Sequence, residues 1–121
     1  MIELRSLRTR AEFAEVFAHG TRWRADYVNV VFLIDGETSA DFGPPGVARL
    51  GIAVSRRFGN AVQRNTFRRR VRDAVRYSNL PAGGYFISPR RDSDAITFAG
   101  LKGDITRLSV EGLRCGLKKV T

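Results

Sequence analysis

The side chains best suited to chemistry in this sequence are arginines, and they are concentrated between residues 56 and 76. Eight arginines and one acid, Asp73, give this stretch a charge of +7, against +9 for the whole chain, so all other residues together contribute +2. Guanidinium groups form bidentate hydrogen bonds with phosphates and stack on bases. The concentration of arginines therefore indicates a surface that binds a polyanion.

Groups for a protein-borne active site are not apparent. The 12 Asp and Glu residues are scattered without a compact motif, and His19 is the only histidine. A metal-dependent nuclease needs clustered carboxylates, and a metal-independent one usually needs a pair of histidines. We therefore expect no catalytic residues and no metal held by the protein itself.

Composition limits the remaining possibilities. A chain of 121 residues, 43% of them hydrophobic, is long enough for one domain with its own core, so we expect residues 1–121 to form one unit. No stretch approaches the roughly 18 apolar residues of a membrane span. The first residues carry charges where a signal peptide is apolar. One cysteine, Cys115, cannot form an internal disulfide, so a reducing cytoplasm is expected.

Several elements must position the arginines. Thr9 and Glu12 match a capping box and Gly20 a helix end, which predicts a first helix between them. Strands are predicted over 27–34, 47–55 and 85–88, with a loop over 35–46 and a last helix over about 98–118. The fold class is α+β, in the order αβββ-like or αββαβα within one domain around a small sheet.

The basic stretch itself reads as one amphipathic helix. At about 100° per residue, Phe67, Val71, Ala74 and Val75 share one side. The opposite side carries Asn65, Arg68, Arg69, Arg72 and Arg76, with Arg64 and Arg70 at the boundaries. Asn60, just after Gly59, is expected to be its N-cap. A solvated face would intersperse acids, because arginines at i and i+4 repel by a few tenths of a kcal/mol per pair. A nucleic acid fits this helix better than a membrane surface, because its apolar side is core-like and lacks Trp or Leu anchors.

One stretch resembles a known family. "RLGIAVSRRFGNAVQRNTFRRRVRDAVR", Arg49 to Arg76, is similar to the signature region of the protein subunit of bacterial ribonuclease P. The segments "EFAEVFAHG" and "YFISPRRD" and the C-terminal helix follow in family order, so the resemblance covers nearly the whole chain. Thr66 departs from the pattern, because the family usually has an arginine there. Arg69, Arg70 and Arg72 could supply replacement charge.

The resemblance implies a specific function. In this family the protein binds a catalytic RNA, and together they remove the five-prime leader of precursor tRNA, with magnesium bound mainly by the RNA, which does the chemistry. The residues that match the RNA-binding positions are Arg56, Arg57, Asn60, Arg64, Asn65, Arg68, Arg69 and Arg72. A cleft between the first helix and the sheet would hold the single-stranded leader, through Phe13, Phe17, Arg90 and Arg91. The resemblance also implies a left-handed crossover between the strands that flank the basic helix.

Two other functions are compatible with a basic α+β domain. A small ribosomal or assembly protein would bind folded RNA without a substrate cleft, and would have no reason to expose Phe13 and Phe17 beside Arg90. A DNA-binding helix–turn–helix needs a short helix just before the basic one, where residues 47–55 predict a strand. For Trp23 and Tyr27, packing in the core and contact with a base both remain open.

Overall fold

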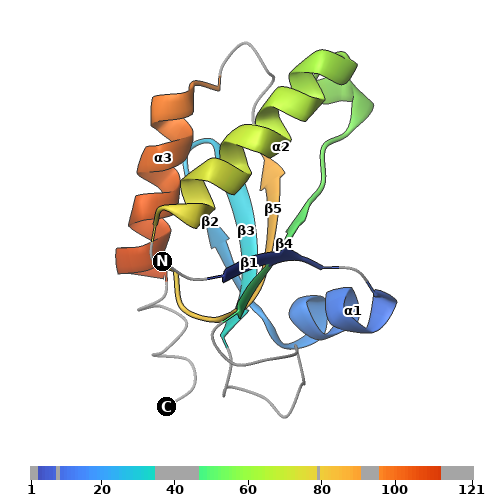
Figure 1. Ribbon diagram of the computed structural model, residues 1–121, viewed down its shortest axis with the longest axis vertical. Coiled ribbons are helices and arrows are strands. Elements are labelled where there is room, and N and C mark those ends of the chain that lie inside the picture. Colours follow the sequence, from blue (N-terminus) through green and yellow to red (C-terminus); the bar gives the residue numbers. More distant parts are fainter. Residues whose placement is uncertain (1–2, 8, 35–46, 79, 91–95, 113–121) are drawn as a thin grey trace.

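A five-stranded mixed sheet lies at the centre of the structure, with helices against both faces (Figure 1). The computed structural model describes residues 3–7, 9–34, 47–78, 80–90 and 96–112. The elements are β1 (Glu3–Ser6), α1 (Arg10–His19), β2 (Thr21–Arg24), β3 (Val28–Ile34), β4 (Val47–Ile52), a 3-10 turn η1 (Arg56–Phe58), α2 (Ala61–Arg76), β5 (Gly83–Pro89), α3 (Phe98–Arg107) and a π-helical turn (Leu108–Gly112). No helix among the described residues is long and apolar enough to cross a membrane.

The strands follow the order β1-β4-β5-β3-β2. β1, β4 and β5 run parallel, whereas β3 and β2 pair antiparallel. The α+β class is confirmed, but the predicted element order omitted β1 and β2. Each of these edge strands is four residues long, which is the shortest run over which alternation indicates a strand. β4 also ends earlier than predicted, at Ile52, after which the chain turns into η1.

The connection from β4 through α2 to β5 has the uncommon hand. In Figure 1 both strands point upward, α2 crosses in front of the sheet, and the chain passes from β4 to β5 on its left. This is a left-handed crossover, as the resemblance implied, although parallel strands are joined in the right-handed sense in about 98% of cases.

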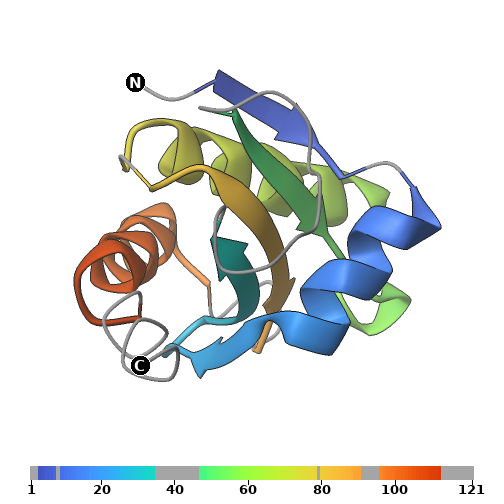
Figure 2. The ribbon, with the colours of Figure 1, turned by 90° about the horizontal axis from the view of Figure 1, so that it is seen from below.

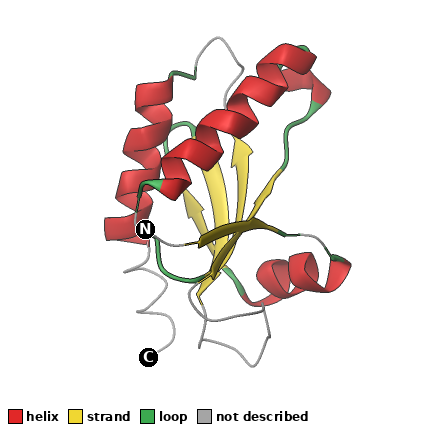
Figure 3. Cartoon of the chain, in the orientation of Figure 1, coloured by secondary structure: helices red, strands yellow, loops and turns green. Residues whose placement is uncertain are grey.

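The sheet separates two apolar clusters. α2 and α3 cover one face and pack next to each other, well away from α1 (Figure 3). α1 lies on the other face (Figure 2), where Val16 packs with Leu7. β3 serves both clusters, because Val30 and Phe32 face α2 while Val31 and Leu33 face α1. Successive residues of a strand point to opposite faces, so this buried strand is apolar throughout.

The predicted helix caps are present. Thr9 Oγ1 accepts the Glu12 amide N–H at 3.1 Å, and the Gly20 amide donates to the Val16 carbonyl at 2.8 Å. At the start of α2, Asn60 and Gln63 form a reciprocal capping box with N–H···O distances of 2.9 and 2.7 Å. These bonds satisfy amide groups that a helix N-terminus leaves unpaired, so both helix starts are fixed by their sequences.

α3 is held to the turn between β2 and β3 by a buried carboxylate. Asp104 is 2% exposed and accepts the Tyr27 amide N–H at 2.7 Å. Arg107 Nη1 lies 2.9 Å from Asp26 Oδ2 and 3.9 Å from Asp104 Oδ1. A Cβ at Gly100 would come within 2.6 Å of the Tyr27 ring, so this glycine allows the ring to lie against α3. Tyr27 therefore packs on the α2 and α3 side of the sheet.

The last predicted helix, 98–118, is shorter in the structure. α3 ends at Arg107 and continues as the π-helical turn to Gly112. Phe98 begins the helix, and Leu101, Ile105 and Leu108 are buried, as the spacing predicted. Residues 113–121, including Cys115, lie outside the described residues.

Replacing Asp104 by Asn should change how stability depends on pH. Burial raises the pKa of Asp104 above its ordinary value of 3.8, more than the Tyr27 amide lowers it. The protonated carboxyl group of Asp104 therefore stabilises the folded state at pH values below its ordinary pKa, and this contribution is lost as pH rises through the raised pKa. Asn keeps an acceptor for Tyr27 but does not titrate.

The measurement is the free energy of unfolding of both proteins between pH 4 and pH 7. Relative to the wild type, Asp104→Asn should become progressively more stable as pH increases. If the difference in unfolding free energy between the two proteins stays constant across this range, the raised pKa of Asp104 would be wrong.

Candidate nucleic-acid interface

The solvent side of α2 carries a continuous arginine face. We define it by the residues that line a shallow groove of about 410 Å³: Asn65, Arg68, Arg69, Arg72, Asp73 and Arg76. The opposite side of the helix, Phe67, Val71, Ala74 and Val75, is buried, as the helical period predicted. Arg68 Nη1 donates to Asn65 Oδ1 at 3.3 Å, and Arg76 lies 3.9 Å from Asp73. With one carboxylate among four arginines, this face has a strong excess of positive charge.

The other predicted RNA-binding residues lie at the N-terminal end of α2. Arg56 and Arg57 are exposed on η1, just ahead of the helix. Arg64 Nη1 donates to the Gly59 carbonyl at 3.1 Å and so fixes the turn into α2. Asn60 uses its side-chain oxygen in the capping box, which leaves its amide nitrogen for any contact with RNA.

Thr66 lies beside the arginine face rather than on it. Its hydroxyl donates to the Val62 carbonyl at 2.8 Å, within the same helix. The side chain is half-buried and does not line the groove of the arginine face. The position where the family usually carries an arginine therefore adds no charge to this surface.

A second, larger groove lies on the other face of the sheet, beside α1. Its volume is about 490 Å³, and we call it the aromatic groove. It is lined by Phe17, Arg22, Trp23, Arg24, Asn29, Val30, Val31, Phe86 and Ser88. These residues come from α1, β2, β3 and β5, which places the groove where the leader cleft was expected.

Strand register arranges the floor of the aromatic groove in two rows. Arg22, Val31 and Phe86 are paired across β2, β3 and β5, and they face α1. The next row is Arg24, Asn29 and Ser88, also on the α1 side. Each row thus begins with an exposed arginine on the edge strand and continues onto the sheet. The groove therefore combines positive charge with an apolar row and a polar row.

Two phenylalanines, Phe17 and Phe86, line the aromatic groove, and Phe13 packs behind them. The Phe17 ring is 39% exposed and meets the Phe86 ring edge-on, with centroids 4.7 Å apart. The Phe13 ring also meets the Phe86 ring edge-on, with centroids 6.0 Å apart. Phe13 is half-buried and does not line the groove. A Cβ on Gly51 would come within 2.8 Å of Phe13 and 3.2 Å of Phe86, so this glycine lets both rings lie on the sheet.

Arg90 has a structural partner outside the groove. Its amide donates to the Tyr27 carbonyl at 2.9 Å, and its Nη1 donates to the Ala25 carbonyl. Arg90 therefore holds the turn that follows Arg24, and it is not among the residues that line the aromatic groove. Its predicted contact with a leader stays a prediction, and Arg91 lies outside the described residues.

The sequence prediction of the cleft did not include Arg22, Arg24, Asn29, Phe86 or Ser88. One signal was available for two of them, because Arg22 and Arg24 alternate with less polar residues, as the outward positions of a strand do. Trp23 lies between them, packs against the α2-side core, and reaches the groove with part of its surface.

Within the described residues, no three His, Cys, Asp or Glu side chains lie close enough to hold a metal ion.

Comparison with known proteins assigns the chain to a family. The family model of Ribonuclease P matches residues 1–111. The chain belongs to the ribonuclease P protein family. The resemblance drawn from the sequence is therefore confirmed, and the chain is a protein component of ribonuclease P, an endoribonuclease that processes tRNA.

Individual relatives and solved structures support this family assignment. The ribonuclease P protein component of Coprothermobacter proteolyticus is 40% identical over 90 residues, covering 71% of this chain and 67% of the relative. That of Gluconacetobacter diazotrophicus is 35% identical over 105 residues, 84% of each chain. The RNase P protein from Thermotoga maritima superposes with a TM-score of 0.66 at 29% identity, covering 86% of this chain and 94% of that one. The Staphylococcus aureus protein, at 23% identity and a TM-score of 0.63, shares the fold.

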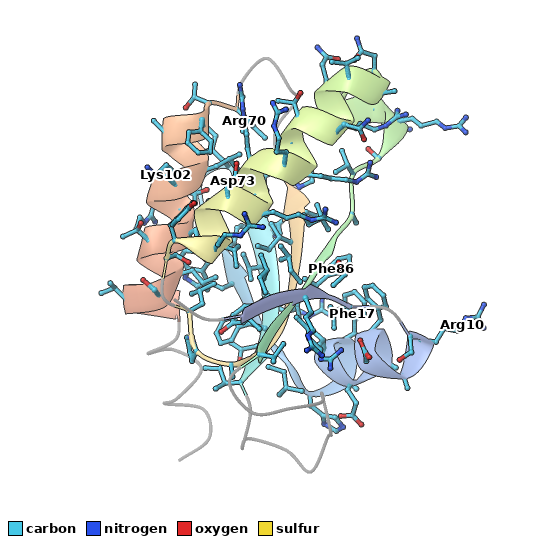
Figure 4. The ribbon with its side chains drawn as sticks, viewed as in Figure 1. Arg10, Phe17, Arg70, Asp73, Phe86 and Lys102 are labelled. Carbon is cyan, nitrogen blue, oxygen red and sulfur yellow. The ribbon has the colours of Figure 1, made fainter. Side chains whose placement is uncertain are left out.

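Substituting Arg72 by Ala should weaken binding to ribonuclease P RNA and make it less sensitive to salt. Each phosphate contact contributes about one unit to the slope of log affinity against log salt, so the slope should fall by about one. Affinity measured between 50 and 200 mM salt tests this expectation. Arg10→Ala is the matched control, because it removes the same charge from an exposed position on α1, away from the arginine face (Figure 4). Equal effects of both substitutions would argue against a specific role for α2.

Proposed function

We propose that this protein binds the catalytic RNA of ribonuclease P through the arginine face and the single-stranded leader of precursor tRNA through the aromatic groove. The observation that carries the proposal is the presence of two different basic surfaces on opposite sides of one sheet. One is a ridge of arginines on a helix, and the other combines arginines with exposed aromatic rings. A ribosomal-type RNA-binding protein would account for the first surface and leave the second without a purpose.

The arginine face suits the backbone of folded RNA. Proteins contact double-stranded RNA mainly through its phosphates and ribose hydroxyls, because its major groove is too deep and narrow for side chains. If about five arginines each neutralise one phosphate, affinity should fall roughly a few hundredfold between 50 and 200 mM salt. Arg56 and Arg57 extend this surface beyond the N-terminus of α2, and Arg64 adds a charge in its first turn.

The aromatic groove suits an unpaired strand. Phe17 and Phe86 offer rings for stacking, while Arg22 and Arg24 can neutralise phosphates along the edge of the groove. Stacking of this kind does not depend on base identity, because every base has a π-face. Asn29 and Ser88 add hydrogen-bonding groups on the floor.

Catalysis in this proposal belongs to the RNA, with magnesium bound mainly by the RNA. The protein would supply affinity for the leader and positive charge between two RNA molecules that repel each other. It would therefore lower the magnesium concentration needed for cleavage. A chain with one cysteine fits the cytoplasm, where we place this function.

A cleavage assay at low magnesium tests the proposal as a whole. Bacterial ribonuclease P RNA and a precursor tRNA are incubated with and without the protein, at a magnesium concentration where the RNA alone is slow. The protein should restore removal of the leader and should cut nothing without the RNA. Tight, salt-sensitive RNA binding without any stimulation of cleavage would instead favour the ribosomal-type function.

The leader groove can be tested separately with Phe17→Ala. This substitution should weaken binding of leader-bearing precursor to the holoenzyme by about tenfold, since stacking on an aromatic side chain contributes about 1–3 kcal/mol per base. Binding of the catalytic RNA and of mature tRNA should not change. Phe98→Ala is the matched control, because Phe98 is 37% exposed, close to the 39% of Phe17, but lies on α3. An equal loss for mature tRNA would show that the groove does not bind the leader.

A further inference from the structure

A small apolar pocket lies between α2, η1 and α3, apart from the two surfaces described above. Its volume is about 130 Å³. The residues that line it are Phe58, Val62, Gln63, Thr66, Phe67, Arg70, Ile96 and Leu101. Phe58, Phe67, Ile96 and Leu101 are each less than a tenth exposed and form the apolar floor. Val62, Thr66 and Arg70 lie around the mouth, so an apolar interior opens between a hydroxyl-bearing and a charged side chain.

The mouth of the pocket adjoins the arginine face. At about 100° per residue, Val62 lies only about 20° around α2 from Arg69, and Thr66 lies about 40° further on. A polyanion bound to the arginine face would therefore reach the pocket if it continued around α2 from Arg69 to Val62. Val62 is 72% exposed at this junction, an apolar side chain next to a row of cations.

The groups at the mouth leave room for a ligand and provide a charge beside it. The hydroxyl of Thr66 is already used, because it donates to the Val62 carbonyl at 2.8 Å. Arg70 is half-buried and extends toward the upper end of α3 in Figure 4. Among the residues that the structure describes, Arg70 has no carboxylate or carbonyl partner. Within that described part of the chain, its guanidinium is available to an anion at the mouth.

We propose that this pocket receives one unpaired nucleobase of the catalytic RNA, with the flanking phosphates on Arg69 and Arg70. The inference rests on the proposed binding of that RNA by α2. An apolar floor next to concentrated positive charge matches a flat base attached to an anionic backbone. An apolar peptide would leave the adjoining arginines without an anionic partner. Proteins also recognise individual RNA bases mainly in loops and bulges, where the bases are unpaired and can enter a pocket.

Thr66→Phe tests the pocket without changing any charge. The larger side chain fills the mouth, and the lost hydroxyl has no partner outside its own helix. Thr106→Phe is the matched control, because the Thr106 hydroxyl also donates to the carbonyl four residues earlier, at 2.8 Å, at an exposed position on α3. Thermal unfolding of each variant verifies that it folds, and Thr66→Leu replaces Thr66→Phe if the latter is destabilised.

Binding of ribonuclease P RNA without precursor tRNA is the first readout. Thr66→Phe should weaken it about tenfold and leave the salt slope unchanged, whereas Thr106→Phe should bind like the wild type. Dimethyl sulfate probing is the second readout. One adenine or cytosine of the RNA should be protected by the wild type and by Thr106→Phe, and reactive with Thr66→Phe.

Three outcomes would overturn the inference. Unchanged affinity with folded Thr66→Phe and Thr66→Leu would mean that no base occupies the pocket, and an equal loss with Thr106→Phe would mean that the effect is not local. If Arg72→Ala still weakens binding in the first case, RNA binding by α2 stands and only the pocket is wrong. If the wild type itself fails to bind this RNA, the proposed function fails together with the inference.

Discussion

The rest of the structure depends on the burial of one side of α2. Phe67, Val71, Ala74 and Val75 pack on the sheet, and fully burying a large apolar side chain stabilises a fold by about 1.5–3 kcal/mol. Repulsion between neighbouring arginines costs only a few tenths of a kcal/mol per pair. Packing therefore outweighs repulsion, and the fold can hold a surface that would not persist on an isolated helix. The arginines can therefore be concentrated on one helix because the apolar core stabilises that helix.

The sheet then keeps the arginine face and the aromatic groove apart. α2 and α3 occupy one face, and α1 covers only part of the other, which leaves the two rows of the aromatic groove open beside it. The left-handed path from β4 to β5 places α2 on the face away from α1. In the proposed function, two RNA segments would consequently contact one small domain without competing for the same side chains.

What the sequence could predict follows from the range of the interactions involved. The arginine face and its buried partners depend on the period of a single helix, so Phe67 and Arg72 were assigned to the correct sides. The caps at Thr9 and Asn60 involve residues three apart and were also found. The aromatic groove depends on pairing between strands, which brings Ser88 next to Arg24 and Asn29 from a position far along the chain. No local pattern contains that register, and the same holds for the contact of Asp104 with Tyr27 across 77 residues.

The turn between β2 and β3 is held at three consecutive residues by two other elements. Arg90 binds the Ala25 carbonyl, Arg107 pairs with Asp26, and Asp104 accepts the Tyr27 amide. The end of β2, with Arg24, is thus fixed before a leader would bind there in the proposed function. Binding to such a preformed groove avoids the entropy cost of ordering a loop. Differences in affinity among leaders should consequently appear in how long each remains bound, with similar rates of association.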